Sequence, residues 1–504
     1  MRNTLLPTVT LIGCLTITSH AQDWDGDTST DFANGDNWVG GTAPNGTQGF
    51  FINNITDGTT FAPVLTSSYT LNPDGATGDA EIGTSGGDGT LDINAGGTLD
   101  GSGNWLFIGR GGGTGSAVTV NDGGSLVSDN DVRLDAGSVT VNNGGTVNVS
   151  RIVQTAGTSV TVNGTGNLTT NSASTSNGSP DIQNLTINNL TSGGSVSGAR
   201  NVVFGNSTST IDGGTINAGS EIYVGNGSGS NSTLIVDSGT VTSNAWIAVG
   251  RNGSTGELNI NGGTITQATQ FIPLGSDLGA GAGNGTINQT SGTLTAPAAR
   301  LGENGASVGT YNISGGTFDA GAGALEIGYN NNTTGTLHIS SSATVTSTGT
   351  TFLGKFDDSV GNLTVDGSAA TISLGDLWVG LDDTGTDSGA VGTIAFVADG
   401  SGVSIINVSG DVNLMSPDGD FLQVDLSAMS GAGVIDIQLI DGTTSQGEFT
   451  GLTQGATVPG AFGGTIDYSV AGDVWLRGVT IPEPSIALLG GLGIIGMLRR
   501  RRTN

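Results

Sequence analysis

Residues 256–265 read GELNINGGTI, and this short stretch predicts the architecture of most of the chain. Apolar and polar residues alternate from Leu258 to Asn261, which is the period of a strand with one buried face. Gly262-Gly263 is typical of a tight turn, because glycine tolerates positive φ, and Thr264-Ile265 begins another strand. We therefore expect two short strands joined by a glycine turn.

The same pattern recurs along the chain, as GTYNISGGTF at 309–318 and, with a longer turn, at 89–99. An apolar residue followed by glycine recurs with it, and its period of about 26 residues lies within the range of repeat proteins. These glycines are Gly83, Gly109, Gly225, Gly250, Gly275, Gly302, Gly328, Gly354 and Gly380. A unit of about 26 residues is too short for a propeller blade and fits one coil of a parallel β-helix.

We predict an all-β chain with a right-handed parallel β-helix over residues 82–394. Each coil would bury its apolar residues only by stacking on its neighbours. About 12 coils at ~4.8 Å each would give a rod about 60 Å long. The period is irregular between residues 130 and 220, where we still expect continuous coils. Residues 22–81 are expected to form an N-terminal cap with the first strands, and residues 395–480 a β-rich C-terminal cap.

The segment 1–21 is typical of a secretory signal peptide. Arg2 is basic, the segment from Leu5 to Ile17 is largely apolar, and cleavage is expected between Ala21 and Gln22. A second interpretation is a lipoprotein signal, because Leu11-Ile12-Gly13-Cys14 resembles a lipobox and would make Cys14 a lipidated first residue. Both interpretations predict export.

The chain ends with three ordered elements in residues 481–504. Pro482-Glu483-Pro484 is followed by the apolar run Ile486–Leu498 and then by Arg499, Arg500, Arg501 and Arg502. The run predicts a short transmembrane helix, and the arginines would hold its far end in the cytoplasm. A simple C-terminal anchor would have the same features.

This order closely resembles the PEP-CTERM sorting signal. The resemblance implies a Gram-negative host, an exosortase-type enzyme as partner, transient anchoring in the inner membrane and removal of the tail near Pro482. It also implies delivery to the cell surface or the extracellular polysaccharide matrix. The body, with Trp24, Asn37-Trp38, Pro44 and its Gly-Gly-Thr strands, resembles the autotransporter-associated β-strand repeat proteins.

The charge of the chain excludes several partners. The formal net charge is -30. Removal of both ends takes five of 13 basic and one of 43 acidic residues, which leaves 8 − 42 = −34. Such a surface repels nucleic acid and anionic lipid headgroups. The single cysteine, Cys14, lies in the leader, so no disulfide is expected in the mature chain.

The sequence offers little for catalysis. His338 is the one histidine outside the leader, and its place between Leu337 and Ile339 matches Asn259 and Asn312 in the repeat. We therefore expect it to face outward from a strand. Arg110, Arg251 and Lys355 follow the recurring glycine, as Glu303 does in another coil, and are interpreted as solvated turn residues.

No metal site or cofactor is predicted. Asp23, Asp25, Asp27 and Asp31 have the early spacing of a calcium loop, but Thr28 replaces its glycine and its last glutamate is missing. Incidental calcium binding stays open.

The leading hypothesis is a non-enzymatic surface or matrix protein that contributes to the envelope, to adhesion or to exopolysaccharide association. Outward ladders of Thr, Ser and Asn could hydrogen-bond sugars. The alternative is a polysaccharide-active β-helix enzyme, a lyase or hydrolase, which would need acidic and basic residues clustered on one coil.

Overall fold

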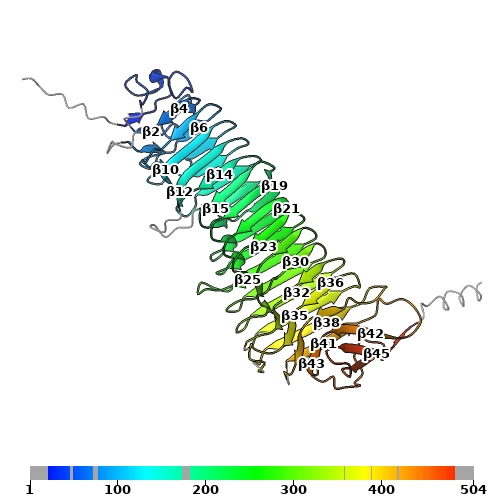
Figure 1. The fold of residues 1–504 in the computed structure, drawn as a ribbon. Helices are drawn as coiled ribbons and strands as arrows, with labels where there is room; N and C mark the ends of the chain where they lie inside the picture. The colour runs from blue at the N-terminus through cyan, green and yellow to red at the C-terminus, as the bar shows by residue number, and fades with distance from the viewer. Residues whose placement is uncertain are drawn as a thin grey trace, which may run out of the picture.

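The chain folds into a long rod of stacked coils, as a computed structural model shows (Figure 1). The structure describes residues 21–45, 49–71, 78–172, 182–356, 358–386, 389–416 and 419–482. Each coil contributes strands to three parallel ladders, which we number in the order in which the chain visits them. The predicted all-β, parallel solenoid architecture is therefore confirmed.

Ladder 1 holds the strands that precede or include the recurring glycine. It contains β1 (Gln22–Asp23), β2 (Phe50–Ile52), β5 (Ala80–Ile82), β8 (Leu106–Ile108), the ends of β10 (Ser125–Leu134) and β12 (Thr146–Gln154), the start of β15 (Ile182–Asn188), β18 (Val202–Phe204), β20 (Ile222–Asn226), β22 (Ile247–Arg251), β25 (Phe271–Ser276), β28 (Ala298–Leu301), β31 (Leu325–Ile327), β34 (Thr350–Leu353), β37 (Asp376–Val379), β40 (Asp411–Leu414) and β43 (Thr444–Gly447).

Ladder 2 holds the strands that follow this glycine. It contains β3 (Val64–Leu65), β6 (Thr90–Ile93), β9 (Ala117–Val120), β11 (Ser138–Val141), β13 (Ser159–Asn163), β15 (Ile182–Asn188), the first parts of β19 (Thr208–Ala218) and β21 (Asn231–Ser243), β23 (Thr255–Ile260), β26 (Asn284–Gln289), β29 (Val308–Ile313), β32 (Thr334–Ser340), β35 (Val360–Asp366), β38 (Val391–Val397) and β41 (Asp420–Asp425).

Ladder 3 follows the Gly-Gly turn. It contains β4 (Ser68–Thr70), β7 (Thr98–Asp100), the starts of β10 and β12, β14 (Asn167–Thr170), β17 (Ser195–Gly198), the ends of β19 and β21, β24 (Thr264–Gln267), β27 (Thr293–Thr295), β30 (Thr317–Asp319), β33 (Thr344–Thr346), β36 (Thr371–Leu374), β39 (Ile406–Val408) and β42 (Gly433–Asp441). The remaining elements are the 3-10 helix η1 (Gly35–Asn37), β16 (Leu190–Thr191), β44 (Thr465–Asp467) and β45 (Val474–Ile481).

The core is a set of aliphatic stacks that run along the rod. In ladder 2, Leu258 pairs with Ile287, and Leu337 pairs with Leu363 in the same inward position. All four side chains are buried. A coil on its own could not hide these residues, because each side chain is covered by the equivalent residue above and below it.

The irregular period between residues 130 and 220 has a structural cause. Ser138 pairs with Ser159 and with Ala117, so the repeat length there is 159 − 138 = 21, shorter than in the later coils. The loop that joins ladder 3 to ladder 1 is absent in these coils, because β10 and β12 run through that corner as single strands. The ladders continue through these shorter coils.

The solenoid is longer than the predicted range. β38 crosses residue 394 and pairs in register with β35 and β41, and ladders 1 and 3 continue through β43 and β42. Ladder 3 holds fifteen strands or strand segments within the described residues, which at ~4.8 Å each gives a rod about 70 Å long. Antiparallel pairing begins with β42 and β45, which lie at the C-terminal end of the rod (Figure 1).

An aromatic cluster lies at the N-terminal end of the described chain. Trp24, Phe32 and Trp38 are buried, with ring centroids of Phe32 and Trp38 4.9 Å apart. Asn37 is fully buried, and its Oδ1 accepts hydrogen bonds from the backbone N–H groups of Thr28 and Ser29. This amide therefore fixes the loop that brings the two tryptophans together.

Within the described residues, no helix is long and apolar enough to cross a bilayer. The predicted transmembrane helix over Ile486–Leu498 lies outside the described residues. Ile481, the first residue of the predicted tail, belongs to β45 and pairs with Gly433 of β42. The right-handed sense of the coil stays a prediction.

Glycine is required where ladder 1 turns into ladder 2. The recurring glycines from Gly225 to Gly380 all have φ between 63° and 80°. A Cβ on Gly250 would lie 1.9 Å from the carbonyl oxygen of Asn284, and a Cβ on Gly285 would lie 2.1 Å from that of Val249. Successive coils thus meet backbone to backbone at this corner.

Gly250→Ala is expected to destabilise the rod strongly, because it adds a backbone clash of about 1–3 kcal/mol to the strain of a positive φ. Gly227→Ala is the matched control, since its φ is 92° but a Cβ there meets no atom within 4 Å. We expect the free energy of unfolding of the control to fall by about 1 kcal/mol. Urea unfolding followed by circular dichroism measures both, and equal losses would contradict the clash.

An ion pair joins β44 and β45 at the C-terminal end of the described chain. Hydrogen bonds from Ser469, Arg477 and Gln454 hold the pKa of Asp467 well below its ordinary value. The Arg477 Nε lies 2.8 Å from an Asp467 carboxylate oxygen.

Because the folded-state pKa of Asp467 is depressed, its stabilisation is present above the unfolded pKa of about 4 and is lost as the pH falls through the folded value. We expect the thermal midpoint of the wild-type chain to fall below pH 4, and Asp467→Asn to remove part of that fall. Thermal scans at pH 2 to 6 measure this, and parallel pH curves for both chains would contradict it.

Candidate functional site

The predicted processing residues lie at the two ends of the described chain. Ala21 directly precedes β1, and the Gln22 backbone N–H donates to the Gly49 carbonyl at 3.1 Å. Pro482 directly follows β45. Cys14, Glu483, Pro484 and the four residues Arg499, Arg500, Arg501 and Arg502 lie outside the described residues.

A strip of charged and aromatic side chains follows the outer face of ladder 1. We call it the cation–aromatic strip, and its members are Tyr223, Trp246, Arg251, Phe271, Arg300, Glu303, Glu326, Tyr329, Phe352, Lys355 and Trp378. The register of ladder 1 brings them together, since Arg300 pairs with Glu326 and Glu326 pairs with Phe352.

Two cations share one buried carboxylate at the centre of the strip. Glu326 accepts from Arg300 Nε at 2.6 Å and from Lys355 Nζ at 2.7 Å. The side chains of Glu326 and Lys355 are only 4% and 8% exposed. Burial opposes the charge of Arg300, but the facing Glu326 carboxylate raises the pKa of Arg300 above its ordinary value. Glu303 completes the group with Ser276, whose hydroxyl donates to it at 2.7 Å.

Aromatic rings cover these cations. The Arg300 guanidinium lies 4.1 Å from the ring centroid of Phe271 and 4.0 Å from that of Tyr329. Lys355 lies 4.4 Å from the Phe352 ring. Cation–π contacts strengthen when the cation is desolvated, as it is here. The strip is therefore a closed network that ties coils together, with Lys355 engaged as a donor and hardly accessible to a substrate.

The interpretation of three basic residues as solvated turn residues is wrong for two of them. Arg251 and Lys355 are buried, and Arg251 donates to the Tyr223 hydroxyl at 2.7 Å. Burial lowers the pKa of Arg251. Arg110 is different, since its side chain is 47% exposed while it pairs with Glu81. The sequence did indicate this buried charge network. Arg300 and Glu326 are one repeat apart and therefore lie side by side on adjacent coils.

The asparagines of the repeat bind one another. At the end of ladder 2, the Nδ2 of each asparagine donates to the Oδ1 of the asparagine one coil earlier, at 2.6 to 2.9 Å. This asparagine ladder consists of Asn94, Asn121, Asn142, Asn163 and Asn188. A second, shorter series joins Asn259, Asn288 and Asn312. These amides stabilise the stacking, so they offer fewer groups to sugars than the sequence predicts.

His338 faces outward, as predicted. It pairs in register with Asn312 and Thr364, and its Nε2 lies 3.6 Å from an Asp366 carboxylate oxygen. Among the residues that the structure describes, no three His, Cys, Asp or Glu side chains gather as metal ligands do.

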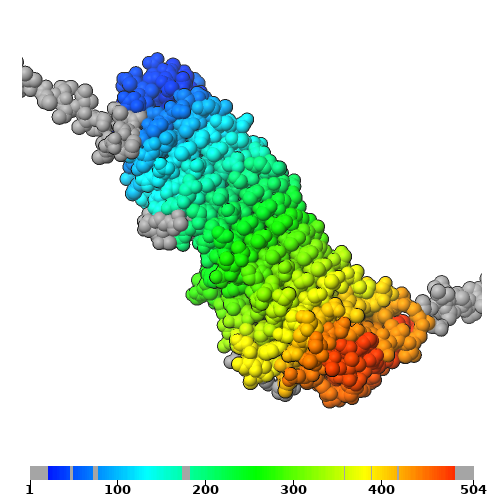
Figure 2. Space-filling model, viewed as in Figure 1, coloured from blue at the N-terminus to red at the C-terminus, as the bar shows by residue number. Residues whose placement is uncertain are grey.

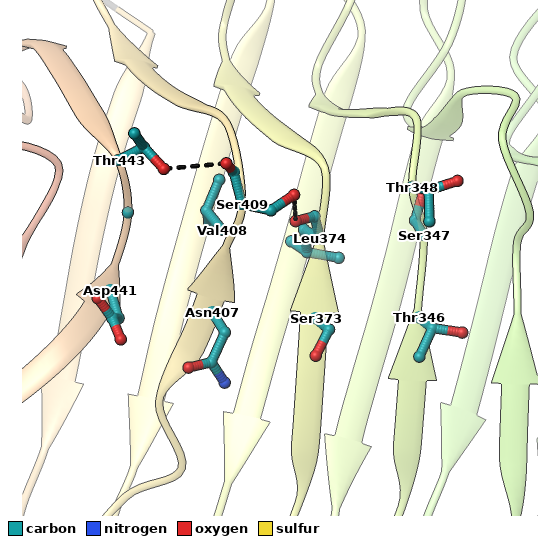
Figure 3. Close-up of a pocket in the computed structure, with 11 residues that line it drawn as sticks. Thr346, Ser347, Thr348, Ser373, Leu374, Asn407, Val408, Ser409, Asp441 and Thr443 are labelled. Atoms are coloured by element: carbon teal, nitrogen blue, oxygen red, sulfur yellow. Dashed lines mark hydrogen bonds between the residues drawn. The ribbon is translucent and has the colours of Figure 1, made fainter.

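A polar groove of about 380 Å³ lies on ladder 3 near the C-terminal end of the rod. Thr346, Ser373, Asn407 and Asp441 form its main row, one from each of four successive strands (Figure 3). Beside this row lie Ser347, Thr348, Leu374, Val408, Ser409, Gly442 and Thr443. Hollows of about 390 and 450 Å³ lie beside Asp23 and beside Asn163. Figure 2 shows one face of the rod, with the stacked coils forming a continuous surface.

Comparison with known proteins identifies the C-terminal tail. Residues 480–502 match the PEP-CTERM protein-sorting motif, which confirms the predicted sorting signal and indicates an exported protein sorted by an exosortase. The match includes Thr480 and Ile481 of β45. No curated protein and no solved structure matches the chain.

Glu326→Gln is expected to destabilise the rod by about 3 kcal/mol, because it leaves the buried Lys355 and the half-buried Arg300 without their shared carboxylate. Asp383→Asn is the control, since Asp383 is 62% exposed and lies 3.8 Å from Lys355. The free energy of unfolding of this control should fall by no more than about 0.5 kcal/mol. Urea unfolding measures both variants, and an unchanged midpoint for Glu326→Gln would show that the network adds no stability.

Proposed function

We propose that this chain is a non-enzymatic structural protein of the cell surface or extracellular matrix. An exosortase-type enzyme would remove the tail after transient insertion in the inner membrane, and the rod would then contribute to the envelope, to adhesion or to exopolysaccharide association. One observation carries the proposal: the sorting motif follows a stacked solenoid directly, with Pro482 next to the last strand.

Many polar side chains of the rod are engaged by other side chains of the rod, and this supports a structural role. The buried charged groups of the cation–aromatic strip are paired across coils, and the amides of the asparagine ladder bind one another. Trp38 lies buried at one end of the rod and β45 pairs with β42 at the other. Groups with shifted pKa values that converge on one place often mark a catalytic site. Here Arg251 and Arg300 have shifted pKa values, but the Tyr223 hydroxyl and the Glu326 carboxylate engage their guanidinium groups.

A second candidate is a polysaccharide lyase or hydrolase. The observation that favours it is the cluster of Arg300, Glu303, Glu326 and Lys355, which joins basic and acidic residues on adjacent coils. A general base must reach the proton that it removes. Lys355 is covered by Phe352 and held by Glu326, so the structural role is the better supported.

The sorting claim predicts a defined mature C-terminus. Mass spectrometry of the protein from its native host should find an end near Pro482, in the surface or matrix fraction. Replacement of all four arginines Arg499–Arg502 by alanine should leave the tail uncut and reduce the surface fraction, because the tail then loses its cytoplasmic anchor. An intact Asn504 on wild-type matrix protein would contradict the proposal.

The same preparation tests for enzyme activity. Incubation with neutral and acidic polysaccharides should release neither reducing ends nor unsaturated products. If products form and Lys355→Met abolishes them while the fold persists by circular dichroism, the enzyme hypothesis replaces the structural one.

A further inference from the structure

The polar groove on ladder 3 is not used by the sorting signal or by the cation–aromatic strip. Its row of Thr346, Ser373, Asn407 and Asp441 presents one polar side chain per coil, at the ~4.8 Å spacing of adjacent strands. Its volume of about 380 Å³ lies within the range of small-molecule sites. The groove therefore offers an extended ligand a regular series of contacts along the rod.

The donors in this groove are largely engaged by the protein itself. The Ser409 hydroxyl donates to the Leu374 carbonyl at 3.3 Å, and the Thr443 hydroxyl donates to the Ser409 carbonyl at 2.9 Å (Figure 3). The Asn407 Nδ2 donates to the Ile372 carbonyl at 3.0 Å.

Two further threonine hydroxyls also donate to the protein. Thr346 donates to an Asp319 carboxylate oxygen at 3.1 Å, and Thr348 donates to the Gly321 carbonyl at 3.1 Å. Each hydroxyl keeps lone pairs that can still accept.

The acceptors remain available. A carboxylate can only accept, and no hydrogen bond within the described residues occupies the Asp441 side chain or the Oδ1 of Asn407. Both residues are exposed. Leu374 and Val408 lie beneath the row and belong to the core, since each is only 4% exposed. The groove thus selects a ligand that is rich in hydrogen-bond donors.

The charge of the groove further restricts the class of ligand that can bind there. Asp441 is the one acidic residue that lines the groove, no lysine or arginine lines it, and the formal net charge of the chain is −30. An anionic polymer would be repelled. Sugar rings carry many hydroxyl donors, and a neutral glycan adds no like charge.

We propose that the ladder 3 groove binds a neutral, hydroxyl-rich polysaccharide, with Asn407 and Asp441 as the main acceptors and the glycan chain crossing successive coils. This inference rests on the proposed matrix function and names the ligand class for it.

Affinity electrophoresis of the full chain tests the proposal, in native gels that contain dextran, galactomannan or the anionic polymer alginate. We expect at least one neutral polysaccharide to retard the wild type and alginate not to. The double variant Asn407→Ala/Asp441→Ala should bind at least tenfold more weakly. Thr266→Ala/Thr295→Ala is the matched control, because both residues occupy the same outward row of ladder 3 outside the groove. It should bind as the wild type does.

Several outcomes would overturn the groove proposal: equal retardation of the groove variant and the wild type, retardation by alginate alone, or no retardation in any gel. Binding that EDTA abolishes would assign the acceptors to a cation and would also overturn it. Thermal scans by circular dichroism confirm that both double variants fold. The mature C-terminus found by mass spectrometry reports separately on the proposed function, so failure of the groove and failure of sorting are distinguishable.

Discussion

The register between successive coils is the constraint on which the structure depends. Every ladder is parallel until β42 meets β45, and equivalent residues face each other from coil to coil. That register places aliphatic residues over aliphatic residues inside the rod and amides over amides outside. The glycine corner maintains it, because a side chain at Gly250 or Gly285 would force the backbones apart. Stability is therefore a sum of contacts between neighbouring coils.

Much of the architecture could be predicted from the sequence. The alternation from Leu258 to Asn261 and the spacing of the glycines predict strands, turns and stacking, because these depend on local pattern alone. The shorter coils between residues 117 and 163 could not be predicted so well, since β10 and β12 pass as single strands through the corner where other coils have a loop between ladder 3 and ladder 1. The continuation past residue 394 was also missed, because the turns there lengthen while the strand pairing persists.

The sorting tail, the cation–aromatic strip and the ladder 3 groove differ in how well a local sequence pattern predicts them. The sorting tail is a linear signal, so Pro482, Glu483 and Pro484 could be identified in sequence. The cation–aromatic strip is assembled from residues one coil apart, and a single turn residue such as Lys355 looks solvated until its neighbours are placed. Outward rows of Thr, Ser and Asn were predicted, but the groove that they form on ladder 3 was not. It depends on which donors the backbone engages, and only the three-dimensional arrangement shows this.

The asparagine ladder gives the rod a direction. From Asn188 back to Asn94, every amide donates toward the N-terminus, so the side-chain dipoles add head to tail along one edge. Hydrogen bonds in such a chain polarise one another. Removal of an interior member would leave an unmatched acceptor on one flank and an unmatched donor on the other. A substitution in the middle of this series thus removes a hydrogen bond on each side, whereas the loss of Asn94 or Asn188 removes one hydrogen bond only.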